Sequence, residues 1–334
     1  MLTRRAALLT LCTGLAACAR TATPPAGPTA LPLPPKAPPP PTPPASLTLP
    51  PRPAATEQAS LWSDSLLYAG WRIQSHFYTG QSRLVDRAGL IRAEGSRDDC
   101  VAALAYLKWK DAVRPTSRQL AILVHGLASS PVIWAPMRKA LEFDGFEVTT
   151  YTYPSTEQSL FVSANGLEQS LLALDPLDYD QVVIVAHSLG GLLTRAALAR
   201  PSFARYPVKV SHVVMLGTPN QGATLAGLLG PLARAAVTAS ANDLTPARAR
   251  QVGPVPVAVQ FGVIAGGQGT ALGLNPLLAG DDDGVVKVAE TRAANMDDHL
   301  ILPLSHSALI SDAQAITSVR RFLQTGRFRP PRTS

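Results

Sequence analysis

Six short apolar segments alternate with stretches of helical periodicity from Pro115 onward, and this alternation constrains the fold more than any other feature. The segments are near-continuous aliphatic runs without the polar alternation of a half-exposed strand. The predicted strands cover residues 120–126, 146–153, 181–188, 210–217, 256–266 and 299–304. Buried strands separated by helices indicate an α/β fold, in which helices cover both faces of a mostly parallel sheet.

The third predicted strand ends in "AHSLG", Ala186 to Gly190, with a serine at the point where the strand turns into a helix. Ligands of parallel sheets collect at the carboxyl ends of the strands, where Ser188 lies. The stretch resembles the nucleophile elbow G-x-S-x-G of the α/β-hydrolase family, with alanine at the first glycine position. Alanine keeps the side chain small, as the tight turn requires. A serine that only caps the helix is the alternative.

A serine hydroxyl needs a base that takes its proton and an acid that orients the base. The family resemblance implies the chain order serine, acid, histidine. Three histidines follow Ser188, and His212 lies near the start of a predicted strand. His306 directly follows the last strand and precedes the final helix, where the family has its catalytic histidine. We therefore expect His306 to be the base, with His299 as the alternative.

The segment "GDDDGVV", residues 280–286, supplies the candidate acids. It resembles the D-G-[VL]-V segment of bacterial lipases, and this resemblance implies that Asp283 is the acid. Asp281 and Asp282 are close competitors. Three consecutive acids are also typical of a solvated turn or a cation-binding loop, but a strand-like "VVKV" follows Asp283.

The resemblance further implies an oxyanion hole made of two backbone N–H groups. They map to Leu189, after the serine, and to Leu127 in "HGLASS". His125 and His187 are expected to shape the site rather than act as bases. The segments "GTPNQG", "ETR" and "FLQTGRF" are also lipase-like, and the resemblance covers about residues 116–328. Residues 223–236, within an Ala/Leu-rich stretch, are either a lid over the serine or an ordinary surface helix.

The first eighteen residues have a charged start and an apolar run too short to span a bilayer. Their end, Leu15 to Cys18, resembles the lipobox of bacterial lipoproteins. We expect a signal peptide over residues 1–17 and an acylated Cys18, hence an exported, membrane-anchored protein. Because Ala19 is not an aspartate, we favour the outer membrane, facing the periplasm or the surface. An ordinary signal peptide is the alternative, and the export route stays open between the general and twin-arginine pathways.

Residues 18–56 are expected to form a tether, because 15 of the 33 residues from Thr21 to Pro53 are proline. Proline removes backbone donors and favours extended chain, so helix and sheet are not expected there. A proline-rich ligand for a partner is the alternative.

Residues 57–114 are predicted to form a helical extension. Apolar residues at helical spacing from Trp62 to Phe77 indicate one helix, structural rather than membrane-bound, and a second is predicted over 97–110. Cys100 is expected to be a buried apolar residue. The main domain then covers residues 115–328, followed by a tail at 329–334.

Most of the formal net charge of +7 comes from the first part of the chain, because residues 1–56 carry five basic groups and no acids. No basic stripe remains for a phosphate backbone, so nucleic acid is not an expected partner. Together the motifs predict a membrane-anchored serine hydrolase of lipid or other acyl esters, without cofactor or metal. An acyltransferase with the same triad and a non-catalytic lipoprotein that binds lipid or protein are the alternatives; protein partners are not predicted.

Overall fold

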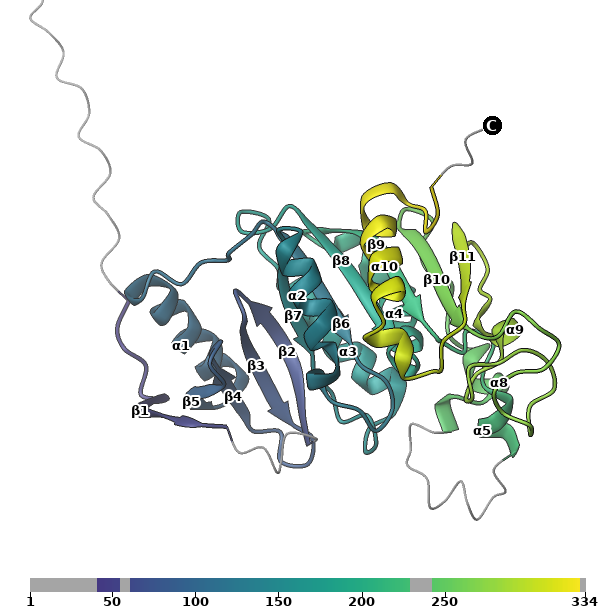
Figure 1. The fold of residues 1–334 in the computed structure, drawn as a ribbon. Helices are drawn as coiled ribbons and strands as arrows, with labels where there is room; N and C mark the ends of the chain where they lie inside the picture. Colours follow the sequence, from purple (N-terminus) through teal and green to yellow (C-terminus); the bar gives the residue numbers. More distant parts are fainter. Residues whose placement is uncertain (1–40, 55–60, 229–241, 331–334) are drawn as a thin grey trace, which may run out of the picture. The chain divides into compact units, whose positions relative to one another are not determined.

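A six-stranded parallel sheet lies at the centre of the computed structural model, which describes residues 41–54, 61–228 and 242–330 (Figure 1). The strand order is β11-β10-β9-β8-β6-β7, and every neighbouring pair is parallel. The strands are β6 (Gln119–Val124), β7 (Glu147–Tyr151), β8 (Gln181–His187), β9 (Lys209–Leu216), β10 (Gln260–Gly266) and β11 (Asp298–Leu302). All six coincide with predicted segments, so the predicted α/β architecture is confirmed.

Helices cover both faces of this sheet because successive residues of a buried strand point to opposite sides. Ile122 and Ile184 pack into one apolar cluster with α3 and α4, whereas Leu123 and Val185 pack into another with α2 and α10 (Figure 1). The helices are α2 (Ala135–Phe143), preceded by the 3-10 turn Pro131–Trp134, α3 (Leu160–Leu172), α4 (Leu189–Leu198) and α10 (Ala313–Thr325). Short 3-10 turns also cover Pro201–Arg205 and Ala308–Ile310.

The predicted helical extension over 57–114 is wrong in its first half, because the described residues there form an antiparallel sheet. Its strand order is β1-β5-β4-β3-β2, and it has no parallel pair. The strands are β1 (Leu47–Pro53), β2 (Trp62–Tyr68), β3 (Trp71–His76), β4 (Ser82–Val85) and β5 (Leu90–Gly95). The second predicted helix, α1 (Arg97–Lys110), is confirmed; Ser96 and Asp99 form a capping box at its start.

The helix expected from Trp62 to Phe77 is instead the hairpin of β2 and β3. Tyr68 pairs with Trp71, and the two residues between them have positive φ, 51° at Ala69 and 76° at Gly70. Positive φ at both central residues is the geometry of a tight hairpin turn. The apolar spacing fitted a helix, but it also fitted strands, and the turn lacks the usual asparagine or aspartate that would have revealed it.

The end of the predicted tether is also corrected, because β1 pairs with β5. Arg52 lies opposite Ile91 and Pro53 opposite Leu90. Strand β1 is at the edge of its sheet and its pairing is irregular between Leu47 and Arg52, two settings in which a strand tolerates proline. The predicted signal peptide, Cys18 and the tether up to residue 40 lie outside the described residues.

The structure describes Cys100 fully and the lid candidate only in part. Cys100 is fully buried on α1, as expected, and burial raises its pKa to about 11. The lid candidate begins with α5 (Thr224–Leu228), but residues 229–241 lie outside the described part; α8 (Pro246–Ala249) follows. Within the described ranges, no helix combines the length and apolarity that crossing a bilayer requires.

Candidate active site

Ser188 stands on a strained turn between β8 and α4. Its φ of 53° and ψ of −124° are sparsely populated by residues other than glycine. The Ser188 N–H donates to the carbonyl of Leu216 at 2.9 Å, which links the turn to the end of β9. A Cβ atom on Gly190 would lie 2.4 Å from the carbonyl oxygen of His125, so only glycine fits there. The predicted strand, elbow and helix are therefore all present.

Asp283 and His306 form a hydrogen-bonded pair, as the motifs implied. His306 Nδ1 lies 2.7 Å from Asp283 Oδ2, and its backbone N–H donates to the Asp283 carbonyl at 2.9 Å. The other carboxylate oxygen accepts from the N–H groups of Val285 and Val286 at 3.0 and 2.7 Å. The Asp283 side chain is fully buried, so these contacts fix both its position and that of the imidazole.

The two competing aspartates point elsewhere. Asp281 accepts from the backbone N–H groups of Gln268 and Gly269, at 2.6 and 2.9 Å. Asp282 Oδ1 accepts from those of Asn275 and Gly284, at 2.9 and 2.7 Å. Both carboxylates thus hold the loop between β10 and α9 (Val288–Thr291).

The same loop was also expected to lead into a strand or to bind a cation. The "VVKV" segment is not a strand, because it bends and then starts α9. No cluster of His, Cys, Asp or Glu suited to a metal ion occurs among the described residues, which gives the cation-loop alternative no support.

The serine and the Asp283–His306 pair both lie at the carboxyl end of the sheet, where intervening residues connect them. Gly217 directly follows β9, and a Cβ atom there would lie 3.0 Å from His306 Nδ1 and 3.1 Å from Asp283 Oδ2. His187, the residue before the serine, has its Nε2 3.0 Å from the carbonyl oxygen of His306. The rings of these two histidines are 4.6 Å apart. The three predicted triad residues are therefore gathered at one place.

The remaining histidines of the domain have structural contacts. His299 lies on β11 and bonds to the Thr291 hydroxyl, and His212 on β9 packs its ring against Phe322. Burial lowers the pKa of both. The ring of His125 stacks on another aromatic ring of the core, and burial lowers its pKa to about 4. Burial, aided by the nearby His306, lowers the pKa of His187 to about 3, so both stay neutral at neutral pH.

Two backbone donors predicted for an oxyanion hole lie beside the serine. A Cβ atom on Gly126 would lie 3.0 Å from Ser188 Cβ, so the loop carrying Leu127 abuts the elbow. Leu189 opens α4. Neither the N–H of Leu127 nor that of Leu189 has a hydrogen-bond acceptor within the described part of the chain. Both are thus available to a ligand oxygen.

Buried contacts that the sequence did not reveal support the edge of the site. Arg195 on α4 donates to the carbonyl and side-chain oxygens of Asn220 at 2.8 and 3.0 Å, which holds the "GTPNQG" loop. Burial lowers the pKa of Arg195 to about 10. Glu290 of the "ETR" segment accepts from the Thr224 N–H at 2.7 Å and so fixes the start of α5. A single sequence carries no signal that joins residues so far apart.

Comparisons with known proteins agree with this fold. The family model described as "alpha/beta hydrolase fold" matches residues 121–234. The structure is similar to the Bacillus licheniformis lipase BlEst2 in its mature form, at 20% identity and a TM-score of 0.50, over 64% of this chain and 93% of that one. The propeptide form matches at 20% identity and a TM-score of 0.53, over 65% and 51%. No curated protein matches the sequence.

Proposed function

We propose that this chain, which has the α/β-hydrolase fold and is lipase- and esterase-like, is a serine hydrolase that cleaves carboxylic esters. The observation that carries the proposal is the 2.7 Å bond between His306 and the buried Asp283, at the same end of the sheet as the strained Ser188. The lipase structures among its neighbours support ester hydrolysis in general.

The protonation of His306 follows from its partner. Because an ionised carboxylate only accepts hydrogen bonds, the proton of the neutral imidazole sits on Nδ1 and points at Asp283. Nε2 is then left with its lone pair and can take the proton of the Ser188 hydroxyl. As the imidazolium forms, Asp283 stabilises the new charge without itself becoming protonated.

The reaction then has two halves. Ser188 Oγ forms a bond to the ester carbonyl carbon, the bond to the alcohol oxygen breaks, and His306 returns its proton to the leaving alcohol. Water then attacks the acyl-enzyme with His306 again as base, which releases the acid and restores the serine. In each half the carbonyl oxygen becomes negative, and the N–H groups of Leu127 and Leu189 stabilise that charge.

His187 holds the base in place. Its only proton at neutral pH is on Nε2, because that nitrogen faces the carbonyl oxygen of His306 at 3.0 Å. This contact holds the backbone carbonyl of His306, and the two hydrogen bonds to Asp283 hold its backbone N–H and its ring. We assign His187 a positioning role.

Labelling of the full chain with a fluorophosphonate probe tests the proposal. We expect the wild type to be labelled and Ser188→Ala to be unlabelled; Ser170→Ala, a buried serine on α3, is the matched control. A folded but unlabelled wild type would favour the non-catalytic binding lipoprotein instead. A panel of p-nitrophenyl esters of graded acyl length, with and without an added alcohol, separates hydrolysis from acyl transfer.

We also propose that the protein is held on a membrane through acylated Cys18, with the proline-rich stretch as a tether up to β1. The lipobox-like end of the first eighteen residues supports this proposal. Each buried methylene of an acyl chain contributes about 0.8 kcal/mol, so several chains hold a protein firmly. Cys18→Ser should move the protein from the membrane fraction to the soluble fraction, and unchanged fractionation would contradict the anchor.

A further inference from the structure

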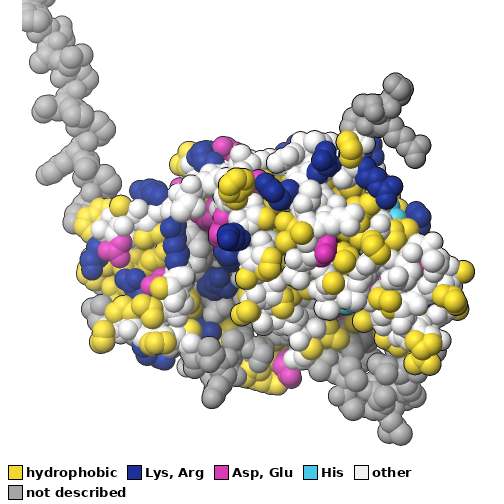
Figure 2. Space-filling model, viewed as in Figure 1, with side chains coloured by type: hydrophobic (Ala, Val, Ile, Leu, Met, Phe, Trp, Pro, Cys, Tyr) yellow, Lys and Arg dark blue, Asp and Glu magenta, His cyan; other side chains and the backbone are white. Residues whose placement is uncertain are grey.

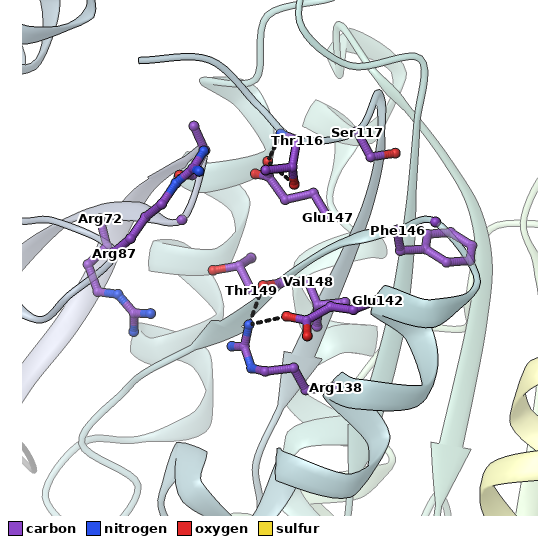
Figure 3. Close-up of a pocket in the computed structure, with 13 residues that line it drawn as sticks. Arg72, Arg87, Thr116, Ser117, Arg138, Glu142, Phe146, Glu147, Val148 and Thr149 are labelled. Atoms are coloured by element: carbon purple, nitrogen blue, oxygen red, sulfur yellow. Dashed lines mark hydrogen bonds and ion pairs between the residues drawn. The ribbon is translucent and has the colours of Figure 1, made fainter. Parts of the chain in front are cut away.

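A cavity of about 660 Å³ lies at the other end of the parallel sheet from Ser188 (Figure 3). It is lined by Glu147, Val148 and Thr149, the first residues of β7, whereas the serine follows the last residue of β8. Strand β7 is the outermost strand of its sheet, and among the described strands it pairs with β6 alone. The turn between β2 and β3 and the end of α2 supply the facing walls.

Three arginines from three separate elements line this cavity. Arg72 comes from β3, Arg87 from the turn between β4 and β5, and Arg138 from α2. Figure 3 shows Arg72 and Arg87 on the side of the N-terminal sheet and Arg138 on the side of α2. In Figure 2, Lys and Arg side chains gather around the same hollow.

The guanidinium groups of Arg72 and Arg87 are only partly used by the protein. Arg72 donates through Nη1 to the Thr152 hydroxyl at 3.2 Å, and the same nitrogen lies 3.8 Å from the Asp64 carboxylate. Arg87 donates through Nε and Nη2 to backbone carbonyls and has no carboxylate within ion-pair distance among the described residues. Arg72 Nη2 and Arg87 Nη1 have no acceptor in that part of the chain.

Arg138 has one carboxylate partner, and it is a weak one. Its Nη1 lies 3.3 Å from Glu142 one helical turn away, an exposed pair of the kind that contributes little. The same nitrogen donates to the Val148 carbonyl at 2.5 Å, while Nη2 has no acceptor among the described residues.

The other lining carboxylate, Glu147, is already engaged. It accepts from the N–H of Thr116 at 2.7 Å and from the Tyr179 hydroxyl at 2.7 Å, so its oxygens are turned to the wall. We propose that the cavity binds a phosphate group, carried by a small phosphorylated molecule or by a lipid headgroup. A tetrahedral oxyanion offers acceptors in several directions, which suits guanidinium groups that approach from two walls better than a planar carboxylate does.

Isothermal titration of the full chain with inorganic phosphate and with glycerol 3-phosphate tests the proposal. We expect Arg138→Gln to weaken binding about tenfold, the loss typical of one charge-assisted hydrogen bond. Glu142→Gln should instead tighten binding by about two- to threefold, because it frees Arg138 from its competitor. Unfolding could imitate the first effect but not the second. Arg118→Gln, which removes an exposed arginine paired with Asp180 outside the cavity, is the matched control.

Cosedimentation with vesicles that contain phosphatidylglycerol distinguishes a lipid headgroup from a small phosphorylated molecule. Cosedimentation that Arg138→Gln reduces and Arg118→Gln does not would identify a headgroup, whereas binding of the soluble phosphates alone would identify a small molecule. The proposal is overturned if the wild type binds none of these probes, or if Arg118→Gln weakens binding as much as Arg138→Gln. Neither the titration nor the cosedimentation depends on ester hydrolysis, so failure of this proposal is distinguishable from failure of the proposed function.

Discussion

Two buried aspartates in different regions of the molecule differ in the groups that they contact. Asp283, on the loop after β10, and Asp64, in β2 of the N-terminal sheet, are at most 1% exposed. Asp283 contacts a partly exposed histidine, His306, the base of the proposed triad. Asp64 accepts hydrogen bonds from the Gln74 amide at 2.8 Å and the Thr152 N–H at 2.7 Å, groups that do not ionise near neutral pH. Burial is therefore common to both aspartates, and we assign them different roles because their partners differ.

Replacing each of the three loop aspartates with asparagine tests the assignment of the acid. We expect Asp283→Asn to lower kcat/KM by on the order of 10⁴, because the amide favours the wrong tautomer of His306. Asp281→Asn and Asp282→Asn should lose less than about tenfold, since each carboxylate only accepts loop N–H groups. Steady-state hydrolysis of a p-nitrophenyl ester measures all three. Full activity in Asp283→Asn would refute our assignment of the acid.

The counterpart is Asp64→Ala, which should affect stability rather than chemistry. It leaves the Thr152 N–H, the Gln74 amide and Arg72 without their partner, so the free energy of unfolding should fall by about 3 kcal/mol. Urea denaturation measures this loss. At a temperature where the variant is folded, its kcat/KM should stay near that of the wild type; a large fall would mean that the N-terminal sheet supports the site directly.

A buried histidine next to the serine, His187, makes the stability of the fold depend on pH. Its pKa falls from 6.5 to about 3 on folding, chiefly through burial. Between these values the unfolded chain binds a proton that the folded chain does not, so stability falls as the pH drops below 6.5. His187→Gln should flatten this slope in urea denaturation between about pH 4 and 7. An unchanged slope would show that His187 is not buried as a neutral ring.

The smallest expected effect tests the hairpin that replaced the predicted helix. In a helix, Gly70→Ala would stabilise the chain by up to about 1 kcal/mol. In the observed turn it should destabilise by about 1 kcal/mol or more, because φ is 76° and the new Cβ would lie 2.8 Å from Arg87 Cγ. Thermal unfolding gives the sign, and the sign alone decides between the two structures.

The success of sequence reasoning differed between these two regions for a physical reason. The parallel strands are buried on both faces, so each appears as a continuous apolar run such as "QVVIVAH". The N-terminal strands place polar residues inside, including the fully buried Asp64, and Trp62 and Ile73 also fit helical spacing. Their polar groups are satisfied by partners that a local pattern cannot show, so the helix prediction failed there.

Apolar runs and short contiguous motifs are enough to predict the parallel sheet, the elbow at Ser188 and the loops that carry the other two triad candidates. Which of the three aspartates faces His306 depends on the folded loop, because neighbouring carboxylates on a bent loop point in different directions, and Asp283 is the one that does. The tertiary structure also decided the antiparallel pairing of β1 to β5 and brought three distant arginines to one cavity. Such contacts join residues far apart in the chain, and only folding brings them together.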